Sequence, residues 1–249
     1  MHDGVFLQAA LNGDRVHPRT PRTPQELAGE ARGAVAAGAQ SVHFHAYGAD
    51  GRESLDADDC AKAIRAVRAA CPQIPISLST SAAIEKDPRQ RLRAITAWFE
   101  MPDLVTANQG EDGIREVCQL LLERRVGIEA GLMSVRDAQL FVASGLASRC
   151  RRVMVEPLDA DADEAVRHAE AMERVVIEAG IALQQVHHGD GVASWAVNHR
   201  AVARGHGIRT GLEDTPVLPS GELARDNRDL VAAAMRIIEA SKTPMLPPG

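Results

Sequence analysis

The sequence has few aromatic residues, with four phenylalanines, two tryptophans and one tyrosine among 249 residues. This scarcity argues against proteins that stack nucleobases on aromatic side chains. It also means that alanine, valine, leucine and isoleucine must build the core. The formal net charge is −6, so no broad positive surface for polyanions is expected. We therefore predict a globular protein that does not bind nucleic acid.

Long apolar runs and paired cysteines are also missing. No run reaches the roughly 18–20 apolar residues that a membrane-spanning helix needs. The first eleven residues are too few and too polar for a signal peptide, so we expect a cytoplasmic protein with no membrane partner. The cysteines form no CxxC pair, which favours reduced thiols over a disulfide framework or a cysteine metal site. They are Cys60, Cys71, Cys118 and Cys150.

The chain instead shows a regular alternation of short β-type runs and longer amphipathic stretches. The predicted strands are Val5–Leu11, Ser41–His45, Ile76–Ser79, Leu104–Ala107, Gly127–Ala130, Arg152–Glu156, Leu183–His187 and Ile208–Gly211. The predicted helices are Pro24–Ala37, Ala57–Ala70, Pro88–Phe99, Ile114–Arg124, Val135–Ser144, Ala162–Ala179, Ser194–Arg204 and Asn227–Ala240.

Eight strand–helix units in about 240 residues predict an α/β fold, a single (β/α)8 TIM barrel with a parallel sheet. An open doubly wound sheet is the alternative. The first predicted strand argues against it, because the sequence that follows is Leu11–Arg15 and not a GxGxxG phosphate loop. We predict one barrel domain over residues 1–242 and a proline-rich tail over residues 243–249.

Polar side chains stand at the end of every predicted strand. Loop residues are often polar, but this combination at all eight ends is more than loop polarity explains. In a barrel enzyme, catalytic residues lie at the carboxyl ends of the strands. The residues are Asn12, His43 with His45, Ser79 with Thr80, Thr106 with Asn108, Glu129, Glu156, His188, and Glu213 with Asp214.

His43 and His45 are the sharpest feature among these ends. Residues i and i+2 of a strand point to the same face, so two imidazoles there can bind one divalent ion. Glu213 is the expected third ligand, because only the first strand separates the eighth strand from the second in a closed barrel. The alternative is a pair of hydrogen-bonded histidines without a metal.

Arg209 and Asp214 form a second candidate cluster. Beside the arginine, Asp214 should stay ionised and could act as a base. The alternative is a structural ion pair at the barrel mouth. Hydroxyl and amide groups that suit a carboxylate or carbonyl oxygen follow the third and fourth strands, although turn and cap roles are common for such residues. His188 is equally compatible with a core histidine.

Several stretches, in order over nearly the whole chain, resemble the β-keto acid cleavage enzymes. They include AALNG from Ala9, PRTPQE from Pro21, VHFH from Val42, GIEAG from Gly127 and RTGLED from Arg209. Each motif alone is weak. The ordered combination of HxH with RxGxED is specific to this family.

The resemblance implies a (β/α)8 barrel that forms an intracellular homo-oligomer, often a tetramer. It implies a divalent metal, usually zinc, on His43, His45 and Glu213. The implied reaction combines a β-keto acid with acetyl-CoA and gives acetoacetate and a new acyl-CoA. Asp214, poised by Arg209, matches the position that removes the C2 proton. The implied substrate-binding positions are Asn12, Ser79, Thr80, Thr106, Asn108, Glu129 and His188.

Three departures distinguish this chain from the resembled family. Arg15 stands where the founding member has a glutamate, no arginine follows His45, and Ser81 replaces a glycine. We hypothesise a short subgroup with altered substrate or CoA handling. A metal-dependent aldolase or hydrolase that needs no CoA is the alternative enzyme. A metabolite-binding barrel without catalysis is the alternative outside enzymes.

Overall fold

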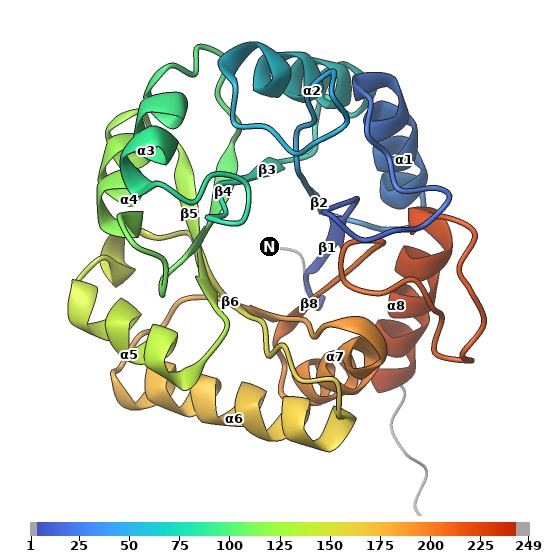
Figure 1. Cartoon of the computed structure of the whole chain (residues 1–249). Coiled ribbons are helices and arrows are strands. Elements are labelled where there is room, and N and C mark those ends of the chain that lie inside the picture. Colours follow the sequence, from blue (N-terminus) through green and yellow to red (C-terminus); the bar gives the residue numbers. More distant parts are fainter. Residues whose placement is uncertain (1–3, 243–249) are drawn as a thin grey trace, which may run out of the picture.

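The computed structural model describes residues 4–242 as eight parallel strands that close into a barrel in sequence order (Figure 1). This confirms the predicted (β/α)8 barrel. Each strand pairs with the next, and β8 closes the barrel on β1. The strands are β1 Leu7–Ala10, β2 Ser41–Phe44, β3 Ile76–Ser79, β4 Leu104–Asn108, β5 Gly127–Leu132, β6 Arg152–Val155, β7 Gln185–His187 and β8 Gly207–Thr210.

Eight α-helices form a ring around these strands (Figure 1). They are α1 Pro24–Ala36, α2 Ala57–Ala70, α3 Pro88–Thr96, α4 Ile114–Glu123, α5 Val135–Ser144, α6 Ala162–Glu178, α7 Ser194–Ala203 and α8 Asn227–Ser241. Within residues 4–242, no helix has the length and apolar character to cross a membrane. The predicted tail over 243–249 lies outside the described residues.

Local sequence signals set several helix starts. Thr23 caps α1, where its hydroxyl accepts from the Glu26 amide and the Glu26 carboxylate accepts from the Thr23 amide. This reciprocal capping box satisfies two amides that the first turn leaves free. Ser134 caps α5 in the same way through the Asp137 amide. The Asp137 carboxylate, however, accepts from the Met133 amide, one residue before the cap.

Helix α3 ends three residues earlier than predicted. The chain leaves the helix at Ala97 so that Trp98 can bury its ring and donate its indole N–H to the Leu55 carbonyl. Arg124 then donates to the carbonyls of Ile95, Thr96 and Trp98 at this helix end. Tertiary packing thus overrides the helical periodicity that continues to Phe99.

The interior of the strand barrel contains a cluster of polar side chains. Gln8 on β1 donates across the barrel to Glu129 on β5, and Ser77 on β3 donates to the other Glu129 oxygen. Arg152 on β6 lies 3.4 Å from the same carboxylate. All four side chains are buried. The apolar core of alanine, valine, leucine and isoleucine accordingly packs between the sheet and the helices.

Gly211 allows the chain after β8 to lie against β1. A Cβ atom at this position would stand 1.8 Å from the Ala10 carbonyl oxygen, so only glycine fits. The backbone amide of Glu213 reaches the same oxygen at 3.4 Å. This close approach brings the loop after β8 toward β2, on the other side of β1.

Candidate active site

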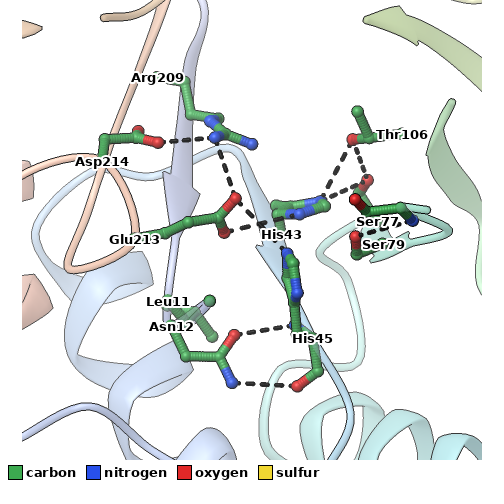
Figure 2. Close-up of polar contacts among 12 residues, drawn as sticks. Leu11, Asn12, His43, His45, Ser77, Ser79, Thr106, Arg209, Glu213 and Asp214 are labelled. Atoms are coloured by element: carbon green, nitrogen blue, oxygen red, sulfur yellow. Dashed lines mark hydrogen bonds and ion pairs between the residues drawn. The ribbon is translucent and has the colours of Figure 1, made fainter. Parts of the chain in front are cut away.

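His43, His45 and Glu213 point toward one another at the carboxyl end of the barrel (Figure 2). His43 lies on β2 and His45 directly follows it, while Glu213 reaches them from the loop after β8. Each Nε2 atom is 3.6 Å from one Glu213 oxygen. One ligand atom of each residue lies within 4.8 Å of the others. The expected adjacency of β8, β1 and β2 thus brings the three predicted metal ligands together.

The donor set fits a divalent cation. Two imidazole nitrogens and a carboxylate oxygen are the ligands of many catalytic zinc sites, where a further position stays open. The Glu213 Oε2 atom is buried and has no hydrogen-bond partner among the described residues. The pKa of Glu213 lies well below its usual value. Burial raises it, but the charges of Arg209 and the two histidines outweigh that effect.

The Nδ1 atom of His43, on the side of the ring away from Glu213, faces the hydroxyl group of Ser77. This nitrogen lies 3.1 Å from Ser77 Oγ, and that hydroxyl donates to Glu129 over 2.5 Å. The Ser77 oxygen can therefore accept the Nδ1 proton, which leaves the Nε2 lone pair toward Glu213. Burial lowers the pKa of His43 to about 3, so this ring is neutral.

Asn12 fixes the backbone of His45. Its amide nitrogen donates to the His45 carbonyl over 3.0 Å, and its oxygen accepts from the His45 amide over 2.8 Å (Figure 2). The same amide group also donates to the Pro21 carbonyl. Asn12 is fully buried. The structure therefore places this predicted substrate residue behind a candidate metal ligand.

Arg209 joins the predicted base to the candidate metal site. Its Nη2 donates to Asp214 Oδ1 over 2.6 Å and to Glu213 Oε1 over 3.1 Å. Burial would lower the pKa of Arg209, but Asp214 and Glu213 raise it above its usual value, so the guanidinium stays charged. Asp214 Oδ2 is buried without a partner among the described residues. Among the described residues, nothing therefore holds this second oxygen of Asp214 by a hydrogen bond.

His188 and Glu156 lie next to the Arg209–Asp214 pair, on the side of β6 and β7. The two ring nitrogens of His188 lie 3.4 Å from Asp214 and 3.6 Å from Glu156. Burial raises the pKa of Glu156. His188 is therefore part of the polar site, although its ring is fully buried.

The residues at the carboxyl ends of β3 and β4 divide between those that face the site and those that support its loops. Thr106 Oγ1 lies 3.3 Å from His43 Nδ1, whereas the Thr80 hydroxyl donates to the Thr106 carbonyl. Asn108 donates its amide to Glu111, a residue that the sequence did not single out. Ser79 accepts from the Ser81 amide at 3.4 Å. Thr80 and Asn108 thus hold the loops in place through these groups.

Glu129 lies beneath the site and not in an open pocket. Its side chain is fully buried, and its oxygens meet Gln8, Ser77, Thr106 and Arg152. This position gives it no surface for a substrate tail. The hydroxyls of Ser77 and Thr106 lie between Glu129 and His43.

Two further side chains, which the sequence pattern did not single out, contact the histidines of the site. Ser77 could have been found, because it precedes Ser79 by two residues and faces the same side of β3. Glu53 carries no such signal, yet its Oε1 lies 2.6 Å from His45 Nδ1. It belongs to the loop between β2 and α2.

Arg15, the main departure from the resembled family, contacts the loop after β8. Its Nε donates to the Glu213 carbonyl over 3.0 Å, and its guanidinium forms an ion pair with Asp190. Arg15 therefore links the loops that follow β1, β7 and β8 above the site.

Comparison with characterised families gives a match over nearly the whole chain. The profile of the beta-keto acid cleavage enzyme family covers residues 4–248. The 3-keto-5-aminohexanoate cleavage enzyme of Fusobacterium nucleatum is 28% identical over an alignment of 254 positions, which covers 95% of this chain and 92% of that protein. The enzyme of the same name from Acetoanaerobium sticklandii is 31% identical over an alignment of 116 positions, which covers 44% of this chain and 42% of that protein.

Solved structures agree on the fold. The binary complex of ObcA with oxaloacetate superimposes with a TM-score of 0.69 at 18% identity, over 92% of this chain and 65% of that one. The ternary complex of ObcA with a C4-CoA adduct and oxalate gives 0.73 at 17% identity, over 90% of this chain and 65% of that one. This chain spans about two thirds of ObcA. Its profile match over residues 4–248 makes it a member of the beta-keto acid cleavage enzyme family.

Proposed function

We propose that this protein is a metal-dependent acyltransferase that condenses a β-keto acid with acetyl-CoA and releases acetoacetate and a new acyl-CoA. The contact that carries the proposal is the one from Arg209 to both Asp214 and Glu213. It sets a buried carboxylate beside a two-histidine, one-carboxylate donor set. A C–C bond adjacent to a keto group is broken through a carbanion, and such chemistry needs both a base and a centre that stabilises negative charge.

His43, His45 and Glu213 would hold the cation. A divalent ion there, with zinc the expected one, supplies Lewis acidity that stabilises negative charge on the keto oxygen of the substrate. Asp214 then takes the C2 proton on its free oxygen while Arg209 keeps the carboxylate oriented. Thr106 and Ser79 offer hydroxyl groups at the neighbouring strand ends for the substrate carboxylate.

The reaction balances without an oxidant or water. The C2 carbanion attacks the thioester carbonyl of acetyl-CoA and forms a new C–C bond. The CoA thiol then passes to the original keto carbon, and the bond between that carbon and C2 breaks. Asp214 returns the proton to the carbanion that leaves, which gives acetoacetate. The products are acetoacetate and the CoA thioester of the substrate tail.

A panel of β-keto acids tests the proposal. Each acid is incubated with the zinc-loaded protein, with and without acetyl-CoA, and acetoacetate and acyl-CoA are quantified together. Formation of both in equal amounts, only with acetyl-CoA present, supports the acyltransferase. Cleavage without acetyl-CoA would instead identify the aldolase or hydrolase. Binding of β-keto acids without any product would identify a metabolite-binding barrel.

A further inference from the structure

Glu53 stands behind His45 on the side away from the candidate cation position. Its Oε1 lies 2.6 Å from His45 Nδ1, whereas His45 Nε2 faces Glu213 Oε1 at 3.6 Å. The imidazole therefore lies between two carboxylates, one at each ring nitrogen. The side chains of His45 and Glu53 are 11% and 15% exposed, so water screens this contact only weakly.

A small hairpin after β2 brings Glu53 to this position. Tyr47 and Glu53 form an antiparallel bridge, and the amide of Ser54 donates to the Ala46 carbonyl over 2.9 Å. Gly51 turns the chain with a φ of +77°, which favours glycine. The Tyr47 hydroxyl donates to the Gly13 carbonyl over 2.6 Å and ties the hairpin to the loop after β1.

The two histidines are supported differently. On the Nδ1 side of His43, the hydroxyls of Ser77 and Thr106 lie between the ring and the Glu129 carboxylate. His45 meets its carboxylate directly, from a loop where the resembled family usually has an arginine. Histidines that ligate metals commonly donate the remaining ring N–H to a carboxylate, which fixes the tautomer and makes the ligating nitrogen more basic.

We propose that Glu53 is a positioning residue for the metal site, which keeps the His45 proton on Nδ1 and directs the Nε2 lone pair toward the cation. This inference rests on the metal site of the proposed function. Glu53 does not act as a ligand itself, because its oxygen meets the ring nitrogen that points away from Glu213. Removal of such a supporting carboxylate typically weakens metal binding by 10–100-fold.

Zinc affinity of the whole chain tests the proposal without any activity measurement. The zinc dissociation constant is obtained by competition with a chromogenic chelator for the wild type and for Glu53→Ala, Glu53→Gln and Asp50→Asn. We expect about 10–100-fold weaker binding for Glu53→Ala and a smaller loss for Glu53→Gln, whose amide oxygen can accept a hydrogen bond from Nδ1. Asp50→Asn removes the same charge from an exposed position of the same hairpin and should stay within about twofold of the wild type.

A second measurement separates positioning from a general loss of structure. Cobalt replaces zinc in the same variants, and its visible absorption reports the ligand geometry. We expect altered bands for Glu53→Ala but wild-type unfolding curves in the presence of a chelator. Equal zinc affinity in Glu53→Ala and wild type would refute the role of Glu53 but not the metal site. A wild-type chain that binds no zinc would refute the metal site and this inference with it.

Discussion

Arg209 donates to Asp214 across 2.6 Å in a setting where both side chains are almost completely buried. The same Nη2 atom of Arg209 also contacts the carboxylate of Glu213, so the guanidinium connects the two acidic residues. A fixed positive charge thus lies between the group that would move a proton and a group that would hold a cation. Such preorganised charge acts strongly where water is excluded.

Replacement of Asp214 by asparagine should abolish turnover and leave metal binding intact. The amide keeps the shape of the side chain and an oxygen for Arg209, but it cannot accept the C2 proton. General-base catalysis contributes about 10²–10⁴-fold, and a decrease of that size is expected in acetoacetate release. Metal content measured on the same sample is the control. Wild-type turnover in Asp214→Asn would remove this residue from the role of base.

Replacement of His43 by alanine should remove the metal. Wild-type protein exposed to zinc and then dialysed is expected to retain about one ion per chain, and His43→Ala close to none. His168→Ala provides a matched control, because His168 is an exposed residue of α6 that contacts Asp159. Elemental analysis of the three proteins decides the question. Zinc retained equally by all three would place the metal elsewhere.

The alternation of elements was enough to predict the barrel, and the i, i+2 spacing was enough to orient His43 and His45. Strand order then brought Glu213 to them. The period of two also predicts that Glu129 points inward, but it does not say at which depth. The strand register sets the depth by pairing Glu129 with Arg152 and Thr106, where its carboxylate meets only buried side chains.

Glu53 shows the other limit of sequence reasoning. Its place beside His45 depends on the turn at Gly51 and on the bond between Tyr47 and Gly13. None of these follows from hydrophobic periodicity, which reports regular elements only. The early end of α3 has a similar origin, because it depends on the distant Leu55 carbonyl that accepts from Trp98.

Loss of the Glu129 charge should destabilise the barrel. Arg152 lies on β6 with its side chain 3% exposed, and Glu129 is its ion-pair partner at 3.4 Å. Glu129→Leu leaves this buried guanidinium uncompensated, which typically costs about 3–5 kcal/mol in the free energy of unfolding. Urea unfolding measures the loss. The double variant Glu129→Leu with Arg152→Met should recover much of it, and no recovery would argue against the buried charge as the cause.

Stability should decrease in acid through Glu173 on α6. Its buried carboxylate accepts from Arg200, Arg204 and His206. Burial raises the pKa of Glu173, but these three partners outweigh it and lower the pKa to about 2 from 4.5. A lowered pKa contributes stability that is complete above pH 4.5 and is lost as the pH falls toward 2, because the unfolded chain takes up the proton first.

We therefore expect Glu173→Gln to be less stable than the wild type by roughly 1.5–3 kcal/mol at pH 7, the usual worth of hydrogen bonds to a charged group. The difference should shrink steadily as the pH falls from about 4.5 toward 2, because the unfolded wild type takes up a proton on Glu173 there while the folded protein keeps the charge. Urea unfolding at several pH values measures it. Glu170→Gln is the matched control, since Glu170 lies on the exposed side of α6 and pairs only with Arg174 among the described residues. A pH-independent difference for Glu173→Gln would show that its charge does not cause the acid sensitivity.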